Sequence, residues 1–325
     1  MTGLEIGFAL LATGFVFVCG ANDGGALLAL GVRHGEVPPY GLLALLLAAV
    51  VAGPALFGLA VARTFTDRLI DPTDRRGPVI VLAGVAVSLV LVLALTWHGI
   101  PTSLTLAVLG GLVGAAAGLG AATAWGVLGQ VLLVAAAAPL VGGGLGFLFG
   151  VAARRLPTYS RLPAAVRVAH LVAFSGQSLA YAANDGQKMF AVAGVALAVV
   201  HGASGMQPPT LPLLAALVLV FGTGAVLSLR RMARGATFGL LPVRPWRLVA
   251  AELAAATAVL GSAGIGAPVS MTQSMAAGLA GAGVSQGIRR VRWQFAGPVL
   301  LAWLVTLPAS LLTGLAVGAL LRVVT

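Results

Sequence analysis

The chain has 325 residues, of which 59% are hydrophobic and 8% are charged, and its mean hydropathy is +1.05. Soluble domains carry about 25% charged residues, so 19 basic and 8 acidic side chains are too few to cover a water-facing surface of this size. The composition therefore predicts an integral membrane protein. The net charge of +11 does not indicate a nucleic-acid binder, because the basic residues lie in short clusters between apolar runs.

Apolar segments follow one another along the chain, and most are long enough to cross about 30 Å of hydrocarbon. They cover residues 4–32, 40–62, 78–98, 100–118, 121–152, 168–202, 210–229, 248–264, 266–284 and 294–321. Two of them are short and begin with Gly and Pro, at 99–101 and 266–268, so we expect broken or re-entrant helices there. The segments 4–32 and 168–202 exceed one span and are interrupted by Asn and Asp, so we expect discontinuous helices. This pattern predicts an all-helical, multi-pass protein of the cell membrane.

Two motifs each occur twice, in the same order and at nearly the same spacing. Ala-Asn-Asp-Gly at 21–24 recurs at 183–186, and Gly-x-Pro-x-Ser-x-Thr at 99–105 recurs at 266–272. The sequence therefore predicts a duplicated unit, with residues 1–155 and 156–325 as two repeats of one membrane domain. Interrupted segments at matching positions of two repeats point to a transport site near the midplane of the bilayer.

The charges of the loops give partial information on the orientation of the chain in the membrane. Two acid-free arginine clusters are expected on the cytoplasmic side by the positive-inside rule. They comprise Arg154, Arg155, Arg161 and Arg167, and Arg230, Arg231, Arg234, Arg244 and Arg247. His98, His170 and His201 fall near segment ends, where we expect interfacial histidines rather than a proton relay. The single cysteine, Cys19, excludes a disulfide framework and a cysteine-based metal site.

Asp23 and Asp185 are the only acids that the pattern places deep inside membrane segments. Each costs about 2.5–3.5 kcal/mol at the centre of a spanning helix, so each needs a cation, a proton or a polar partner. The alternative is that each carboxylate caps the half-helix that follows it. Asn22 and Asn184 offer amide donors and an acceptor beside the carboxylates, or they serve to tolerate unwound backbone.

Further polar residues follow the second break and the two proline motifs. Lys188 is the only lysine, and it either pairs with an aspartate or contacts an anion; these roles do not exclude each other. The proline motifs predict helix starts, with proline in the first turn, hydroxyl caps, and free N–H groups that attract anions. The candidate ligands are Gln187, Lys188, Ser103, Thr105, Ser270, Thr272 and Gln273. Gln273 has Leu106 as its counterpart, so the repeat does not support it.

The chain resembles the PiT-type inorganic phosphate transporter family in both halves. The resemblance rests on GANDGG at 20–25, PTSLT at 101–105, AANDGQK at 182–188 and PVSMTQ at 268–273. It implies a secondary transporter with two inverted repeats that takes up phosphate together with Na⁺ or H⁺. The aspartates and asparagines of both breaks would line the phosphate and coupling-ion sites, and the serines and threonines would contact phosphate from re-entrant hairpins.

The match has departures. Leu104 and Met271 stand where the family usually has a second hydroxyl residue, Leu106 and Gln273 stand where a histidine is common, and Gly24-Gly25-Ala26 follows the first aspartate, where the family commonly places another asparagine further along. These substitutions leave open whether the coupling ion is Na⁺ or H⁺, and whether phosphate or sulfate is preferred.

We therefore expect a secondary transporter that moves inorganic phosphate by alternating access, with no cofactor, no metal beyond Na⁺ and no enzymatic activity. A bare aspartate repels phosphate, so a cation or proton has to bind with the anion. The expected partners are phosphate and the lipid bilayer, not nucleic acid, and a homo-oligomer stays open. The alternatives are a sulfate or other oxyanion permease of the same fold and, remotely, an intramembrane enzyme with an aspartate dyad.

Overall fold

The computed structural model describes residues 3–34, 37–70, 74–97, 102–155, 162–203, 205–233 and 245–324. Nearly all of this part of the chain is helical, and its isolated β-bridge joins Ile70 to Thr123. Gly99, Pro101, His98, Arg161, Arg234 and Arg244 lie outside the described residues.

The described residues contain seven helices that are long and apolar enough to cross a membrane, in agreement with the predicted multi-pass membrane protein. The helices of the first half are α1 (Gly3–Cys19), α2 (Gly25–Gly31), α3 (Pro39–Phe57), α4 (Ala60–Arg63), α5 (Gly77–Trp97), α6 (Leu104–Gly118) and α7 (Trp125–Ala153). Those of the second half are α8 (Leu162–Ala183), α9 (Gln187–Val200), α10 (Leu211–Met232), α11 (Pro245–Gly264), α12 (Met271–Val284) and α13 (Ala296–Val324).

Both long segments are interrupted where the Asn-Asp motifs predicted, but in different ways. The first break is a π-helix, Gly20–Gly24, in which the N–H of Gly25 donates to the carbonyl of Gly20. π-Helical turns insert one residue into a helix and are frequent at functional sites. The second break is a turn at 184–186 between α8 and α9, where the N–H of Gly186 donates to the carbonyl of Tyr181.

The two proline motifs precede the short helices α6 and α12, whose N-cap residues are Ser103 and Ser270. The hydroxyl of Ser103 accepts a hydrogen bond from the N–H of Leu106 at 3.3 Å, as an N-cap does. Pro268 lies two residues before the N-cap, outside the helix, so the expectation of proline in the first turn is wrong there. The extended backbone of Ser270 explains this, because the chain turns into the helix only after it.

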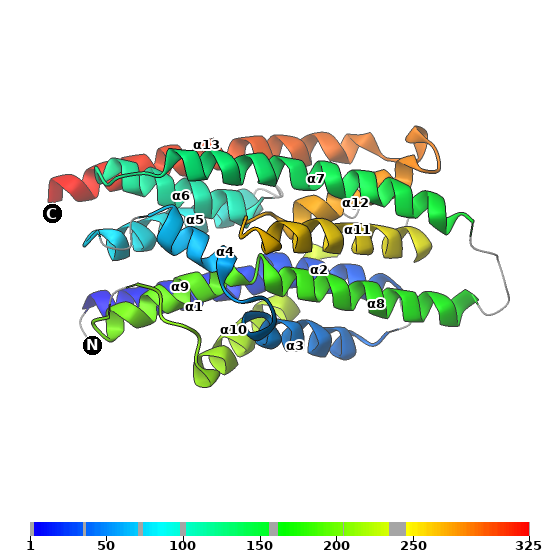
Figure 1. Ribbon diagram of the computed structural model, residues 1–325, viewed down its shortest axis with the longest axis horizontal. Helices are drawn as coiled ribbons and strands as arrows, with labels where there is room; N and C mark the ends of the chain where they lie inside the picture. Colours follow the sequence, from blue (N-terminus) through cyan, green and yellow to red (C-terminus); the bar gives the residue numbers. More distant parts are fainter. Residues whose placement is uncertain are drawn as a thin grey trace.

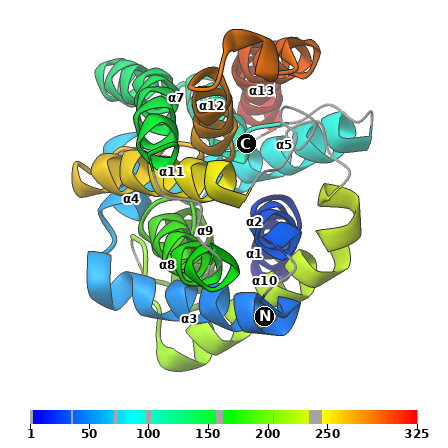
Figure 2. The ribbon, with the colours of Figure 1, turned by 90° about the vertical axis from the view of Figure 1, so that its right-hand side faces the viewer.

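Figure 1 shows α6 and α12 on opposite sides of the middle of the molecule, and each helix runs from the middle toward its own end of the long axis. Their N-terminal ends meet, since the hydroxyl of Thr105 lies 3.3 Å from the carbonyl oxygen of Val269. Figure 2 shows α7, α12 and α13 in one group and α1, α3, α8, α9 and α10 in another, with α5 and α11 between them. The middle of the molecule is therefore where helix N-terminal ends and both breaks are brought together.

The short helices pack across the two halves: α6 lies along α13, and α12 lies along α7. Glycines make this close approach feasible, because a Cβ at Gly114 would meet the carbonyl oxygen of Leu311, and one at Gly281 that of Gly143. In lipid there is no hydrophobic driving force between helices, so association depends on the close van der Waals packing that small residues allow. Each half of the chain is thus held by a helix of the other half.

Candidate functional site

Lys188 joins the two breaks. It lies in the first turn of α9 and is 1% exposed. Its Nζ donates to Oδ1 of Asp185 and to the hydroxyl of Thr105, the latter at 2.7 Å, and lies 3.9 Å from Oδ2 of Asp23. Of the two roles expected for Lys188, the ion pair is present, and it involves an aspartate from each half of the chain.

Asp185 is held at the start of α12. Its Oδ2 accepts the N–H of Met271 at 2.6 Å, and its Oδ1 accepts the hydroxyl of Thr105 at 3.0 Å as well as the ammonium. A carboxylate at a helix N-terminus gains from the free N–H groups and the helix dipole. The capping alternative is wrong for this residue, because the N-cap of α9 is Gly186, without a side-chain hydrogen bond, and Asp185 instead bonds to the first residue of α12.

Asp23 is less fully bonded. Its Oδ1 accepts from Nδ2 of Asn22 at 2.8 Å, whereas its buried Oδ2 has no hydrogen-bond partner among the described residues and faces only the more distant ammonium. It does not cap α2 either. The site therefore holds two carboxylates against one ammonium, and one carboxylate oxygen has spare capacity for a cation or a proton.

The amides of the second break are committed to the protein. Asn184 donates from Nδ2 to Ser262 Oγ at 3.0 Å and to the carbonyl of Ala267 at 2.9 Å, and its Oδ1 accepts the N–H of Val269 at 3.0 Å. Gln187 donates to the carbonyl of Ala183 at 2.7 Å and accepts the N–H of Ala62 at 3.0 Å. These bonds fix the break against the approach to α12 and against α4.

The remaining candidates lie at the two helix starts. The hydroxyls of Ser270 and Thr272 are 2.9 Å apart, so Ser270 bonds to its neighbour rather than capping α12. Gln273 is buried in the first turn of α12, and Ser103 caps α6 as described above. The structure thus brings Asp23, Asp185, Lys188 and Thr105 into one contact network, with Ser270 and Thr272 flanking Met271, which binds Asp185.

A second buried polar pair escaped the sequence argument. His170 on α8 and Glu252 on α11 are both fully buried, with Nδ1 and Oε2 3.0 Å apart, and Nε2 of His170 lies 3.0 Å from the carbonyl oxygen of Gly31. The expectation of an interfacial histidine is wrong here, because α8 begins eight residues before His170. The carbonyl of Gly31 can only accept, so Nε2 of His170 carries a hydrogen. One further proton then lies between Nδ1 of His170 and Oε2 of Glu252, whether it is assigned to the imidazole or to the carboxyl group. The signal in the sequence was one acid inside an alanine-rich apolar run at 250–256.

The fold and the site define a class: a multi-pass helical membrane protein in which paired helix interruptions meet at a buried polar centre, as in secondary transporters. The model of the phosphate transporter family matches residues 19–314, and the chain belongs to this family. The members are transporters and not enzymes, in agreement with the non-enzyme prediction and against the aspartate-dyad alternative.

Relatives agree with this assignment. A probable low-affinity inorganic phosphate transporter of Mycobacterium bovis is 33% identical over 312 residues, which cover 93% of this chain and 74% of the relative. Its counterpart in Bacillus subtilis is 27% identical over 321 residues, covering 96% and 95%. A solved structure named as the sodium-dependent phosphate transporter shares the fold, with a TM-score of 0.80 over 100% of both chains at 17% identity.

Proposed function

We propose that the protein is a cation-coupled symporter of inorganic phosphate that works by alternating access between its two halves. Family membership supports the substrate. The observation that carries the proposal is the position of Lys188, held between Asp23 and Asp185 from the two different breaks.

The charge balance of this centre favours symport. Two buried carboxylates and one ammonium leave one negative charge in excess, and a phosphate ion adds more in a region of low dielectric. A cation or proton that binds with the anion removes this repulsion. Oδ2 of Asp23 is the atom we assign to the coupling ion, because it is buried and has no hydrogen-bond partner among the described residues. The relative named for sodium dependence favours Na⁺.

The phosphate-binding part of the proposed site consists of the hydrogen-bond donors that contact the carboxylate of Asp185 in this structure. The N–H of Met271, the hydroxyl of Thr105 and the ammonium of Lys188 all donate to its carboxylate. These are donors that suit a phosphate oxygen. Phosphate would compete with Asp185 for them, assisted by Ser103, Ser270, Thr272 and Gln273, while Asn22, Asn184 and Gln187 hold the breaks in place.

We also propose that the halves 1–155 and 156–325 are inverted repeats, and that α5 with α6 and α11 with α12 form re-entrant hairpins. In Figure 1, α7 and α13 run in opposite directions, and α6 and α12 point toward opposite ends of the molecule. Inversion of one repeat relative to the other gives both features. It also allows one site to be exposed alternately to either side.

Reconstituted protein in liposomes tests the function. We expect uptake of labelled phosphate driven by an imposed Na⁺ or proton gradient, and resistance to excess sulfate. Asp23→Asn and Asp185→Asn should abolish coupled uptake, whereas the matched variant Asp67→Asn, at an exposed carboxylate outside the site, should retain it. Normal uptake by both site variants contradicts the proposal. Equal inhibition by sulfate would instead support a general oxyanion permease.

A further inference from the structure

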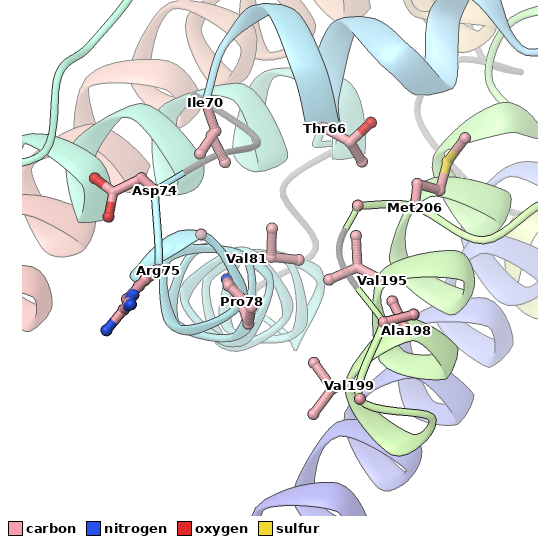
Figure 3. Close-up of a pocket in the computed structure, with 14 residues that line it drawn as sticks. Thr66, Ile70, Asp74, Arg75, Pro78, Val81, Val195, Ala198, Val199 and Met206 are labelled. Atoms are coloured by element: carbon pink, nitrogen blue, oxygen red, sulfur yellow. The ribbon is translucent and has the colours of Figure 1, made fainter.

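A cavity of about 340 Å³ opens at the end of the molecule that carries both chain termini. It lies between the start of α5, the end of α9 and the π-helix Thr64–Arg68. Figure 3 shows Asp74 and Arg75 on one side of it, and Val81 and Val195 among the apolar residues that line it. The cavity is thus charged at one rim and apolar within.

A second, narrow void of about 10 Å³ lies beside Lys188 of the proposed transport site. Thr66 and Val81 line both spaces, and Lys188 lines the narrow one. The other lining residues of the narrow void are Phe65, Val85, Val108, Leu112, Ala191 and Val192. The side chain of Lys188 therefore borders a void whose lining includes two residues of the open cavity.

The face of α9 connects the two spaces. Lys188, Val192, Val195 and Val199 follow one another at spacings of four, three and four residues, which places them on one side of the helix. At 1.5 Å per residue, Val195 lies about 10 Å along the axis from Lys188. The route from the cavity to the site is therefore two helical turns long.

We propose that this cavity is the vestibule through which phosphate reaches Lys188, and that Phe65, Val85 and Val192 form its closed gate; the proposal rests on the proposed function. All three side chains are buried. An apolar constriction excludes hydrated ions until it widens. The exposed Arg75 at the rim raises the local concentration of anions.

The vestibule opens to the outer side of the membrane. The end of α7, the start of α8 and the turn region between α12 and α13 lie at the opposite end of the molecule in Figure 1. That end carries Arg154, Arg155, Arg289, Arg290 and Arg292, whereas the segment before α5 at the vestibule end carries fewer arginines, Arg75 and Arg76. Arginine-rich connections mark the cytoplasmic side, whereas acids count little.

Cysteine labelling tests the route, because Cys19 is fully buried and should leave the unmodified protein insensitive to thiol reagents. Val195→Cys and Val199→Cys place a thiol in the vestibule. Leu197→Cys is the matched control, since it lies on the same helix but does not line the cavity. The probe is a membrane-impermeant, anionic methanethiosulfonate, applied to right-side-out and to inside-out membrane vesicles.

We expect both vestibule thiols to react in right-side-out vesicles, the outer Val199→Cys faster, and the reacted variants to lose most phosphate uptake while Leu197→Cys keeps it. Complete labelling of Val195→Cys with unchanged uptake, reaction only in inside-out vesicles, or no reaction overturns the vestibule. Uptake by unlabelled Val195→Cys shows separately that the transport function stands. If no variant transports phosphate, the function fails, and the labelling pattern still decides whether the cavity opens outward.

Discussion

Replacement of Lys188 by Met should separate the structural cost of the central charge cluster from its role in transport. The methionine keeps most of the apolar stem and removes the ammonium. Asp185 then loses its ion pair and Asp23 loses the cation 3.9 Å from its Oδ2, although both remain buried. Removing one partner of a buried pair costs about 3–5 kcal/mol, and we expect a loss of stability of this size together with loss of uptake.

Asp185→Asn should cost less, because the amide oxygen still accepts from Met271 and Lys188 keeps Asp23 as a counter-charge. We expect a loss of about 1–3 kcal/mol, the range for an impaired buried hydrogen bond. In the double variant Lys188→Met/Asp185→Asn, the two groups are removed together. Its loss should be smaller than the sum of the single losses by about 0.5–3 kcal/mol, since the residues are in direct contact.

Denaturant unfolding in detergent micelles measures these differences, and Arg155→Met serves as a control because its side chain is exposed. That control should change stability by no more than about 0.5 kcal/mol. All three variants of the central cluster should be inactive in the liposome assay. Additive losses in the double variant, within about 0.5 kcal/mol, would refute the coupling of Lys188 to Asp185; restored uptake would refute the assignment of the pair to the transport site.

Three further predictions concern packing, the second buried pair and a surface pair. Gly281→Ala should destabilise by about 1–3 kcal/mol, because its Cβ meets the backbone of α7, whereas Gly144→Ala has open space around it; equal melting temperatures would contradict this. Glu252→Leu should cost about 1–3 kcal/mol more than Glu252→Gln, whose amide can still donate to the histidine nitrogen; equal unfolding midpoints would refute it. Hydrogen bonds from Arg76 hold the pKa of Asp74 below its usual range, so this pair stabilises the fold above about pH 3.9 and its contribution fades as the pH falls through the lower folded value. Arg76→Ala should raise the pKa of Asp74 in an infrared titration of the carboxylate, and an unchanged pKa would show that the pair is not formed.

Much of the central arrangement follows from local sequence. The Asn-Asp motifs predicted interrupted helices at Asp23 and Asp185, since an acid and an amide in an apolar run disfavour an ordinary spanning helix. The repeat predicted that the two breaks share one site, and an ion pair with an aspartate was one of the two roles expected for Lys188. Local chemistry predicts each break because its Asn and Asp are adjacent in the chain, and the repeat relates the two breaks although they lie in different halves.

Other features depend on contacts between distant segments. Asp185 binds the start of α12 rather than α9, a choice that depends on where Met271 lies in space. The apolar run predicted at 248–264 places Glu252 near its start, whereas α11 begins at Pro245 and packs against α7, α8 and α12. No periodicity in one segment reveals such partners, so the pair with His170 was missed.

The glycine-lined contacts of α6 with α13 and of α12 with α7 bear on how the protein is assembled during synthesis. The helix that fills the groove of α6 begins more than 170 residues after α6 ends, so it is synthesised long after α6. Until then the groove at Gly114 faces lipid or a second chain. The first half therefore reaches its final packing only after the last helix has been inserted, and truncation before α13 should leave the chain exposed to membrane quality control even though every residue of the first break has been synthesised.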